Sequence, residues 1–255
     1  MRLRHALSMT DNTQPISASQ RPPILSAGIF DVDGVLLASP HERAWREALG
    51  DPADEARFTT AVYQSQVAGK PRLAGALAAL QALGRPHADR EAADYAQRKQ
   101  RRLEELIHAG AVNAFPDALR FVRAVMALGW PMAVASSSKN ANEMMKLVRL
   151  DADHSLLEVF GSNVCGRDLK QGKPNPEIFL LAAADLPAAP GNCFVVEDAP
   201  AGIEAACAGG MTGLGVARLH DAASLRAAGA SLVVTSLDKV SIEELSLGRL
   251  CRRAP

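Results

Sequence analysis

The chain has 255 residues, a length that suits one large domain or two small ones around a filled apolar core. Lys and Arg number 28 and Asp and Glu also number 28, so the formal net charge is zero. Proteins that bind nucleic acids or membrane surfaces normally carry a basic excess, and no apolar run here is long enough to span a bilayer. The sequence therefore predicts a soluble protein with neither nucleic-acid nor membrane partners.

The two ends of the chain and its cysteines bear on where the protein works. Residues 1–23 are rich in Ser, Thr, Gln and Pro and lack the apolar segment of a secretory signal, so we expect a flexible N-terminal tail. We also expect a short C-terminal tail at 246–255. The cysteines lack the spacing of a zinc site or redox pair, which favours a reducing, cytoplasmic setting; they are Cys165, Cys193, Cys207 and Cys251.

The first predicted strand ends in a pair of carboxylates. An apolar run from Ile24 to Phe30 is followed by Asp31, Asp33 and then Gly34. Burying two carboxylates in a sheet is costly, so we expect them at the carboxyl end of the strand, facing a cleft. There they could hold a hard cation, and one could attack phosphorus. The alternative is a turn built on Asp33-Gly34 that has no chemical role.

A helical stretch follows this strand. Pro40 is tolerated at the start of a helix, and no convincing strand occurs before residue 113. Apolar residues at helical spacing predict two further helices, one with Leu73, Leu77 and Leu80 and one with Ala92, Tyr95, Leu103 and Leu106. The basic residues Arg98, Lys99, Arg101 and Arg102 are expected mostly on other faces of the latter. We therefore expect an all-helical domain at 40–112, inserted between one strand and the next.

From residue 113 onward, helices alternate with short apolar strands. Strands are predicted at 131–136, 162–165, 193–197, 213–217 and 231–235, with helices at about 115–128, 142–150, 176–186 and 200–208. Strands separated by helices imply right-handed crossovers and a mostly parallel sheet. The sequence therefore predicts an α/β, doubly wound core domain made from 24–39 and 113–245.

Polar residues follow several of these strands. Ser136 to Asn140 follow the second, Glu197 and Asp198 end a later one, and Lys173 lies in the loop Gly172 to Glu177. The carboxyl ends of parallel strands meet at one edge, so these groups should converge on Asp31 and Asp33. Carboxylates for a cation, a hydroxyl and amides for a phosphate, and a fixed positive charge are what phosphoryl transfer needs.

With these four segments in order, the chain resembles the haloacid dehalogenase superfamily of phosphotransferases, from about Leu25 to Leu237. The helical insertion after the first motif resembles the type 1 cap of that superfamily. The resemblance implies that Asp31 is a nucleophile forming an aspartyl phosphate and that Asp33 is a general acid and base. It also implies a Mg²⁺ site with Asp31, Asp33 through its carbonyl, and Asp198 as ligands, and Glu197 in or beside it.

The resemblance also implies roles for two further core residues: Ser136 would hold the transferring phosphoryl group and Lys173 would screen charge on Asp31. Three details are similar to the β-phosphoglucomutase subfamily. Ala135 to Asn140 resembles the segment that holds a distal phosphate, and Gly69 to Arg72 resembles a cap loop that grips the same phosphate; the third detail is a histidine, His41, beside the general acid. The implied substrate-binding residues are His41, Arg72, Ser137, Ser138, Lys139 and Asn140.

Each position has a structural alternative. Asp198 could be a helix cap, Ser136 a strand-end hydroxyl and Lys173 a solvated loop lysine. Asn140 and Glu143 could form a capping pair, Arg72 could be a surface charge and His41 an exposed first-turn residue. His41 also lies nearer to Asp33 in sequence than in the subfamily, and Ala38 stands where relatives often carry Asp.

The functional hypothesis is a Mg²⁺-dependent enzyme that transfers phosphoryl groups on a small phosphorylated metabolite, foremost a sugar phosphate, as a mutase or a phosphatase. The alternative from another class is a catalytically silent binding protein on the same fold. The cap implies a lid with hinges near Leu37 to Pro40 and near Gly110 to Asn113. The sequence specifies neither the sugar nor the oligomeric state.

Overall fold

The computed structural model describes residues 24–219 and 221–254. Within them, six strands form a parallel sheet in the order β5-β4-β1-β6-β7-β8. The strands are β1 (Ala27–Phe30), β4 (Met132–Val134), β5 (Ser162–Asn163), β6 (Cys193–Glu197), β7 (Thr212–Val216) and β8 (Leu232–Val234). The predicted doubly wound α/β fold is confirmed. The tail expected at 1–23 lies outside the described residues.

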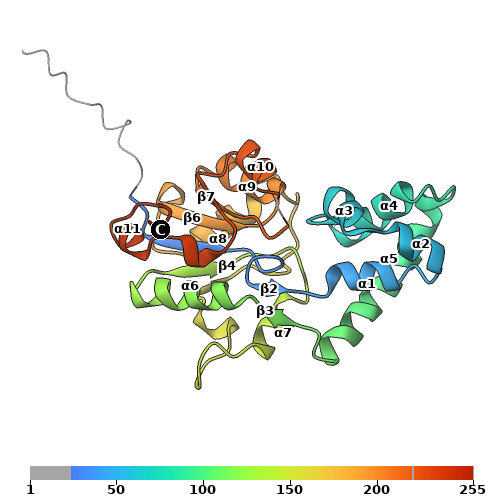
Figure 1. Ribbon diagram of the computed structural model, residues 1–255, viewed down its shortest axis with the longest axis horizontal. Helices are drawn as coiled ribbons and strands as arrows, with labels where there is room; N and C mark the ends of the chain where they lie inside the picture. The colour runs from blue at the N-terminus through green and yellow to red at the C-terminus, as the bar shows by residue number, and fades with distance from the viewer. Residues whose placement is uncertain (1–23, 220, 255) are drawn as a thin grey trace, which may run out of the picture.

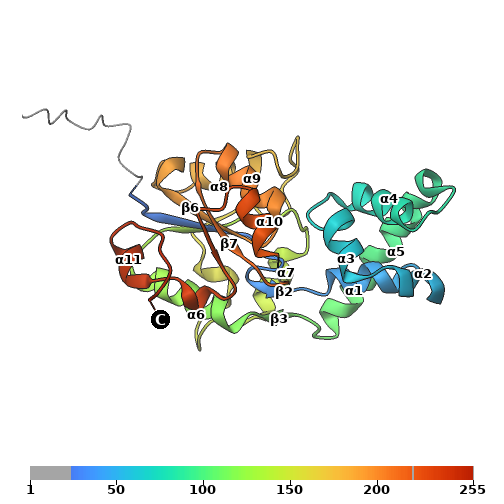
Figure 2. The same ribbon diagram turned by 45° about the horizontal axis from the view of Figure 1, so that its top comes forward.

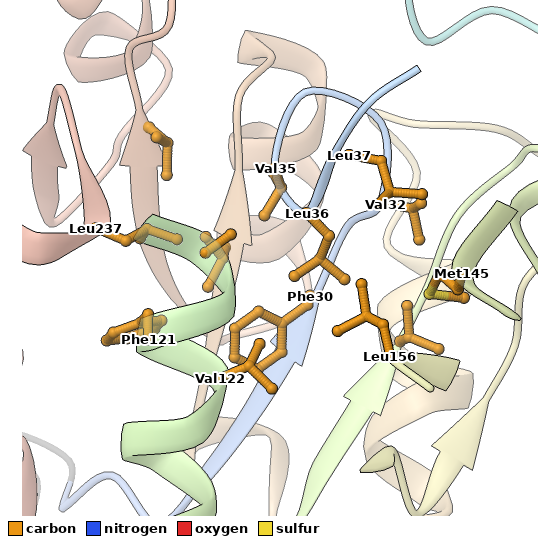
Figure 3. Packing of buried hydrophobic residues seen from close by; sticks show 14 of the residues in the cluster. Phe30, Val32, Val35, Leu36, Leu37, Phe121, Val122, Met145, Leu156 and Leu237 are labelled. Carbon is orange, nitrogen blue, oxygen red and sulfur yellow. The ribbon is translucent and has the colours of Figure 1, made fainter. Parts of the chain in front are cut away.

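Helices cover both faces of this sheet (Figure 1). One face carries α6 (Pro116–Ala127), α7 (Ala141–Leu147) and α11 (Ile242–Ser246), and the other α8 (Glu177–Ala184), α9 (Pro200–Ala208) and α10 (Ala222–Ala227). Strand β1 is buried on both sides, since Ile29 packs with α8 while Phe30 packs with α6. Figure 3 shows Phe30 beside Phe121 and Val122 of α6, with Leu156 nearby.

Two short strands connect this sheet to a group of helices. Strands β2 (Leu37–Ala38) and β3 (Asn113–Ala114) form an antiparallel pair. Residues 39–112, all described, contain no strand; they form α1 (His41–Glu47), α2 (Pro52–Arg57), α3 (Thr60–Val62), a π-helical turn (Tyr63–Val67), α4 (Arg72–Ala82) and α5 (Ala88–His108). We refer to residues 40–112 as the helical insert. It lies to one side of the sheet, and Figure 2 shows the same separation from another direction.

The insert has an apolar cluster of its own. The buried faces of its helices differ from the predicted faces at two residues, Leu73 and Lys99. Leu73 was expected on the packed face of α4, but its side chain is 59% exposed. Leu80 is buried on that face as predicted, but small residues take the place of Leu73, because α4 packs closely: a Cβ on Gly75 would lie 3.3 Å from the Trp45 ring. On α5, Lys99 does not lie on an outer face but is 3% exposed, because that side of α5 is turned toward the sheet.

The C-terminal stretch also differs from the tail expected at 246–255. The amide of Ser241 donates to the carbonyl of Cys251 at 2.9 Å, and the amide of Arg253 donates to the carbonyl of Lys239 at 2.7 Å. The Arg252 guanidinium donates to the carbonyl of Val233 on β8, also at 2.7 Å. Two of these bonds pair the stretch with residues 239–241, and the third ties it to the edge strand β8, so the stretch is fixed against the sheet.

Candidate active site

The polar residues predicted at the strand ends lie together at the carboxyl edge of the sheet. Asp31 follows β1, Ser136 follows β4 and Glu197 ends β6, and these are three neighbouring strands at the centre of the sheet. Facing them is the helical insert, and a cavity of about 530 Å³ lies between the two parts. Its lining includes Asp31, Asp33, Ser136 and Lys173 from the sheet side, and His41, Tyr63, Arg72 and Lys99 from the insert.

Lys173 lies at the floor of this cavity rather than in a solvated loop. Its ammonium donates to Asp31 Oδ1 at 2.6 Å and to Glu197 Oε1 at 2.5 Å, and all three side chains are buried. Burial alone would lower the pKa of Lys173, but the carboxylates of Asp31 and Glu197 outweigh it and raise the pKa well above its usual range. Lys173 is therefore a permanent positive charge beside Asp31.

Three carboxylates crowd this floor. One oxygen from each of Asp31, Glu197 and Asp198 lies within 4.8 Å of the others. Burial raises the pKa of Asp31 to about 7, because Lys173 opposes it only in part and Glu197 and Asp33 add repulsion. Burial and the neighbouring carboxylates also raise the pKa of Asp198. A divalent cation would offset this excess of negative charge, and carboxylate oxygens are the ligands that Mg²⁺ prefers, so the residues fit a Mg²⁺ site.

The roles of the carboxylates around such a cation differ. Glu197 Oε1 accepts from Lys173, and Oε2 accepts from the amides of Asp198 and Ala199 at 3.1 and 3.2 Å. Both carboxylate oxygens of Glu197 thus already accept hydrogen bonds, which suits a residue that positions Lys173 and the backbone at Asp198 rather than one that binds the cation directly. Asp198 does not cap α9, since that helix has no side-chain cap bond. Asp31 and Asp198 are therefore the carboxylates available to a cation.

Two glycines permit this close arrangement. Gly34 has a φ of +81°, and a Cβ there would lie 1.9 Å from Asp198 Oδ2. A Cβ on Gly202 of α9 would lie 2.0 Å from the Glu197 carboxyl carbon. Any larger residue at either position would displace an acidic side chain. The turn at Asp33-Gly34 therefore exists, but it is part of the site and not an alternative to it.

Asp33 faces the insert. Ser136 Oγ lies 3.5 Å from Asp33 Oδ2, and His41 Nε2 lies 3.6 Å from Asp33 Oδ1. Asp33 Oδ1 is buried and has no hydrogen-bond partner among the residues that the structure describes. The other ring nitrogen of His41, Nδ1, lies 2.8 Å from Lys99 Nζ. A row of groups thus runs from Lys99 through His41 to Asp33, so His41 is not an exposed first-turn residue despite the short spacing.

The charges of this row follow from burial. Burial lowers the pKa of His41 to about 4, with Lys99 and Arg72 adding to the shift and Asp33 opposing it. Burial likewise lowers the pKa of Lys99 to about 7, and Asp33 opposes this shift. At neutral pH the imidazole is uncharged, so Nδ1 accepts from Lys99 and the Nε2 hydrogen points toward Asp33 and Ser138. Nothing in the helical periodicity singled out Lys99; its buried neighbours Tyr95 and Leu103 were the available signal.

The segment after β4 carries the residues predicted to hold a distal phosphate. Ser138 Oγ lies 3.2 Å from His41 Nε2, and Ser136 Oγ accepts from the amide of Ser138 at 3.1 Å. Asn140 makes no capping bond on α7; its Oδ1 accepts from Gln100 of α5 at 3.1 Å. Lys139 is exposed and pairs with Asp168 at 3.0 Å. Ser137 and Arg72 also line the cavity, so the whole predicted set lies around it.

Tyr63 and Gln100 are two further cavity residues that the sequence did not single out. Tyr63 opens the π-helical turn, and burial together with Asp33 and Asp198 raises the pKa of its phenol. Its hydroxyl therefore remains protonated and can donate to an anionic group in the cavity. Short π-helical turns are frequent at functional sites, but sequence periodicity does not distinguish them from α-helix.

Comparisons with known proteins agree with this geometry. The family model of haloacid dehalogenase-like hydrolases matches residues 26–210. A β-phosphoglucomutase of Mycobacterium bovis is 32% identical, over 85% of this chain and 91% of its own. A phosphorylated carbohydrates phosphatase of Thermotoga maritima is 31% identical, over 82% and 94%. An archaeal β-phosphoglucomutase structure from Pyrococcus superposes with a TM-score of 0.68 at 30% identity, covering 86% of this chain and 96% of that one.

Proposed function

Because this chain belongs to the haloacid dehalogenase-like hydrolase family, within which it is an enzyme of the phosphatase and phosphomutase kind, we propose that it is a Mg²⁺-dependent mutase of a sugar phosphate. The observation that carries the proposal is that one cavity is lined by two sets of residues. Asp31 with its partner Lys173 belongs to the first set, and the cationic and amide side chains of Lys139, Asn140 and Arg72, which could hold a second phosphate, form the other. A sugar bisphosphate needs both ends to be held while it turns over.

In the proposed first half-reaction, a carboxylate oxygen of Asp31 attacks the phosphorus of the substrate. The bond from phosphorus to the sugar oxygen breaks, and an aspartyl phosphate forms on Asp31. Lys173, which lies 2.6 Å from Asp31 Oδ1, offsets part of the repulsion between the two anions. When bound by Asp31, the Asp33 carbonyl and Asp198, Mg²⁺ supplies the remaining positive charge.

The proton of this step passes through Asp33. In its protonated form it gives a proton to the departing sugar oxygen, and in the second half-reaction it takes one from the hydroxyl that attacks the aspartyl phosphate. Ser136 Oγ, 3.5 Å from Asp33 Oδ2, is placed to bind the phosphoryl group. His41 and Lys99 hold Asp33 from the insert side.

We further propose that the insert acts as a cap domain that opens to admit substrate and closes to exclude water. The close contacts His41–Ser138 and Gln100–Asn140 join it to the sheet side across the cavity. Its hinges would lie at Leu37 to Pro40 and at Gly110 to Asn113, next to the paired strands β2 and β3. Water exclusion protects an aspartyl phosphate from hydrolysis, which a mutase needs more than a phosphatase does.

The proposed partner is a small phosphorylated sugar. Among residues 24–219 and 221–254, no helix is both long enough and apolar enough to cross a membrane. The balanced charge gives no support to nucleic-acid binding. A catalytically silent protein is not favoured, because Asp31, Asp33, Lys173 and Asp198 are all present and gathered around one cavity.

The test uses purified protein, Mg²⁺ and β-glucose 1-phosphate, primed with a trace of glucose 1,6-bisphosphate. Glucose 6-phosphate and free phosphate are followed in the same reaction. Formation of glucose 6-phosphate without free phosphate is the expected result. Free phosphate as the main product would replace the mutase proposal with a phosphatase.

The matched control is Asp31→Asn, which removes the nucleophile and keeps the shape of the side chain. It should abolish both products. If neither product forms with wild-type protein, other sugar phosphates are tested in the same way, and inertness toward all of them would overturn the proposal.

A further inference from the structure

A largely covered arginine beyond strand β7 binds the backbone of the loop that carries Asp33. Arg218 Nε donates to the carbonyl of Gly34 at 3.2 Å, and Arg218 Nη2 donates to the carbonyl of Val35 at 3.1 Å. These are the two peptide carbonyls that directly follow Asp33. Neither the reaction scheme above nor the sequence motifs assign a role to Arg218.

The other side of the guanidinium is fixed as well. Arg218 Nη1 donates to both carboxylate oxygens of Asp117 at 2.8 and 3.0 Å, and the guanidinium lies 3.9 Å from the centre of the Phe115 ring. Asp117 in turn accepts from the amide of Leu237 at 2.8 Å. The Arg218 side chain is 15% exposed and that of Asp117 is 9% exposed, so this is a sheltered ion pair.

The loop itself is tightly wound. The amides of Leu36 and Leu37 both donate to the carbonyl of Val32 at 2.9 Å, and the amide of Gly34 donates to the carbonyl of Leu37 at 2.8 Å. Figure 3 shows the side chains of Val35 and Leu36 in the apolar cluster around Phe30. Apolar packing thus holds the loop through its side chains, while Arg218 holds it through its carbonyls.

Both connections to the insert pass this point. Strand β2 begins at Leu37, directly after the loop, and Phe115, which stacks on Arg218, directly follows β3. The amide of Phe115 also donates to the carbonyl of Leu36 at 3.0 Å. The two segments through which the insert is attached therefore adjoin the loop that carries Asp33.

We propose that Arg218 is a positioning residue that fixes the Asp33 loop and the sheet-side ends of both hinge strands, so that Asp33 keeps its place while the insert moves. This inference rests on the proposed function for the part that concerns catalysis. A planar guanidinium can serve two adjacent carbonyls and a carboxylate at once, whereas a lysine ammonium can replace the charge but not the fork.

The experiment compares Arg218→Lys with wild-type protein and with Arg120→Lys as a matched control. Arg120 also pairs through two bonds, at 2.6 and 2.8 Å, with an aspartate, Asp238, and lies on α6 near Asp117, but it makes no contact with the loop. For each protein we would measure kcat and KM, the melting temperature, and amide hydrogen exchange of the peptide covering residues 32–39. Arg218→Ala serves as a second variant.

We expect Arg218→Lys to keep the Asp117 ion pair and melt near the wild-type temperature. Its kcat should fall about 100-fold, the cost of a displacement of about 1 Å, with KM changed less than about twofold. Exchange in residues 32–39 should rise about tenfold, with other peptides unchanged. Arg218→Ala should show the same pattern and a lower melting temperature. The Arg120→Lys control should match wild type in kcat and in exchange.

The inference is overturned if Arg218→Lys retains wild-type kcat, or if both Arg218 variants lower kcat only in proportion to the fraction unfolded. Either result would make Arg218 an ordinary stabilising residue. Wild-type protein without turnover would overturn the proposed function instead. In that case the exchange of residues 32–39 still decides whether Arg218 holds the loop.

Discussion

At the scale of single residues, Asp31 and Asp33 have different surroundings although one residue separates them. Asp31 is bonded to Lys173 at 2.6 Å on the floor of the cavity. Asp33 meets no cation at hydrogen-bond distance among the described residues, and its nearest basic group is the uncharged imidazole of His41 at 3.6 Å. A fixed positive charge suits the proposed role of Asp31 as nucleophile, and its absence suits the proposed role of Asp33 as a group that gains and loses a proton.

The buried state of His41 predicts a pH dependence of stability. Its pKa is about 4 in the folded protein against the usual 6.5, so between these values the unfolded chain binds more protons than the folded one. Stability contributed by the neutral imidazole is therefore lost as the pH falls from 6.5 to 4, by about 3 kcal/mol at most. Urea unfolding at pH 7 and pH 4.5 measures this loss.

The variant His41→Gln should lose about 2 kcal/mol less than wild type between those two pH values, because it has no group to protonate. The exposed residue His87, which makes no capping bond at the start of α5, provides the control. His87→Gln should lose as much as wild type does. Equal losses in wild type and His41→Gln would show that His41 is not held neutral.

The close packing of Gly202 against Glu197 predicts that a larger residue at this position weakens Mg²⁺ binding at the proposed metal site. The methyl group of Gly202→Ala would overlap the Glu197 carboxyl carbon at 2.0 Å, so Glu197 must move and break its bonds to Lys173 and to the amide of Asp198. We expect kcat to fall about 100-fold and the Mg²⁺ concentration for half-maximal activity to rise about tenfold. A Mg²⁺ titration of activity measures both.

Gly161→Ala provides the matched control, because the nearest atom to a Cβ at that position is 3.8 Å away, an ordinary contact. It should leave kcat and the Mg²⁺ requirement unchanged. If Gly202→Ala keeps the wild-type Mg²⁺ requirement, Glu197 does not support the metal site.

At the scale of elements, α5 connects the insert to the segment after β4, residues 136–140, which is proposed to hold the distal phosphate. Gln100 Nε2 donates to Asn140 Oδ1 at 3.1 Å and Asn140 Nδ2 donates to Gln100 Oε1 at 3.5 Å, which fixes the Asn140 amide and leaves its second Nδ2 hydrogen available to a phosphate. For Gln100→Leu we predict a KM for glucose 1,6-bisphosphate about fivefold higher, the effect of one neutral hydrogen bond. Steady-state kinetics with glucose 1,6-bisphosphate measure this change.

A generic aryl phosphate, which has no second phosphate, should be turned over by Gln100→Leu as by wild type. Gln81→Leu makes the same substitution at an exposed position of α4 and should leave the KM for both substrates unchanged. An equal rise in KM for both substrates would mean that Gln100 acts on the whole insert and not on the distal phosphate.

The order of elements could be predicted from sequence, but the faces of the insert could not. Short apolar runs located the strands and helical spacing located the helices, because the strands are buried on both faces and each helix is buried on one. Lys99 was placed on an outer face because a lysine is expected in water; its burial depends on α5 turning toward His41. The apolar character of Leu73 was equally misleading, since small residues allow the closer packing of α4.

The same limit applies to the site. Asp31, Asp33, Ser136, Lys173 and Asp198 could be predicted to meet because the carboxyl ends of parallel strands share one edge. Arg218, Gln100 and Tyr63 lie beside segments that are distant in sequence, and a contact between distant segments leaves no pattern in either one. Gln100 and Tyr63 line the cavity because the insert is folded over the sheet, whereas Arg218 contacts Gly34 because β7 and β1 belong to one sheet.

At the scale of the whole molecule, the site and the chain end lie far apart. Figure 1 shows the C-terminus near α11, on the side of the sheet away from the insert. The N-terminal approach to β1 is also fixed there, since the amide of Leu25 donates to the carbonyl of Gly248 at 3.0 Å. The end of the chain therefore stabilises the sheet at the edge opposite the catalytic groups.

This arrangement predicts that removing residues 250–255 lowers stability without lowering activity. The deletion removes three hydrogen bonds, from the Ser241 amide to Cys251, from the Arg253 amide to Lys239 and from the Arg252 side chain to Val233. At about 1 kcal/mol each, their loss should lower the melting temperature by about 5–10 °C, while kcat at 25 °C stays within about twofold. Arg252→Ala, which removes one of the three, should show about a third of the shift. A deletion variant that melts within about 2 °C of wild type would mean that this stretch frays in solution, as a C-terminal tail would.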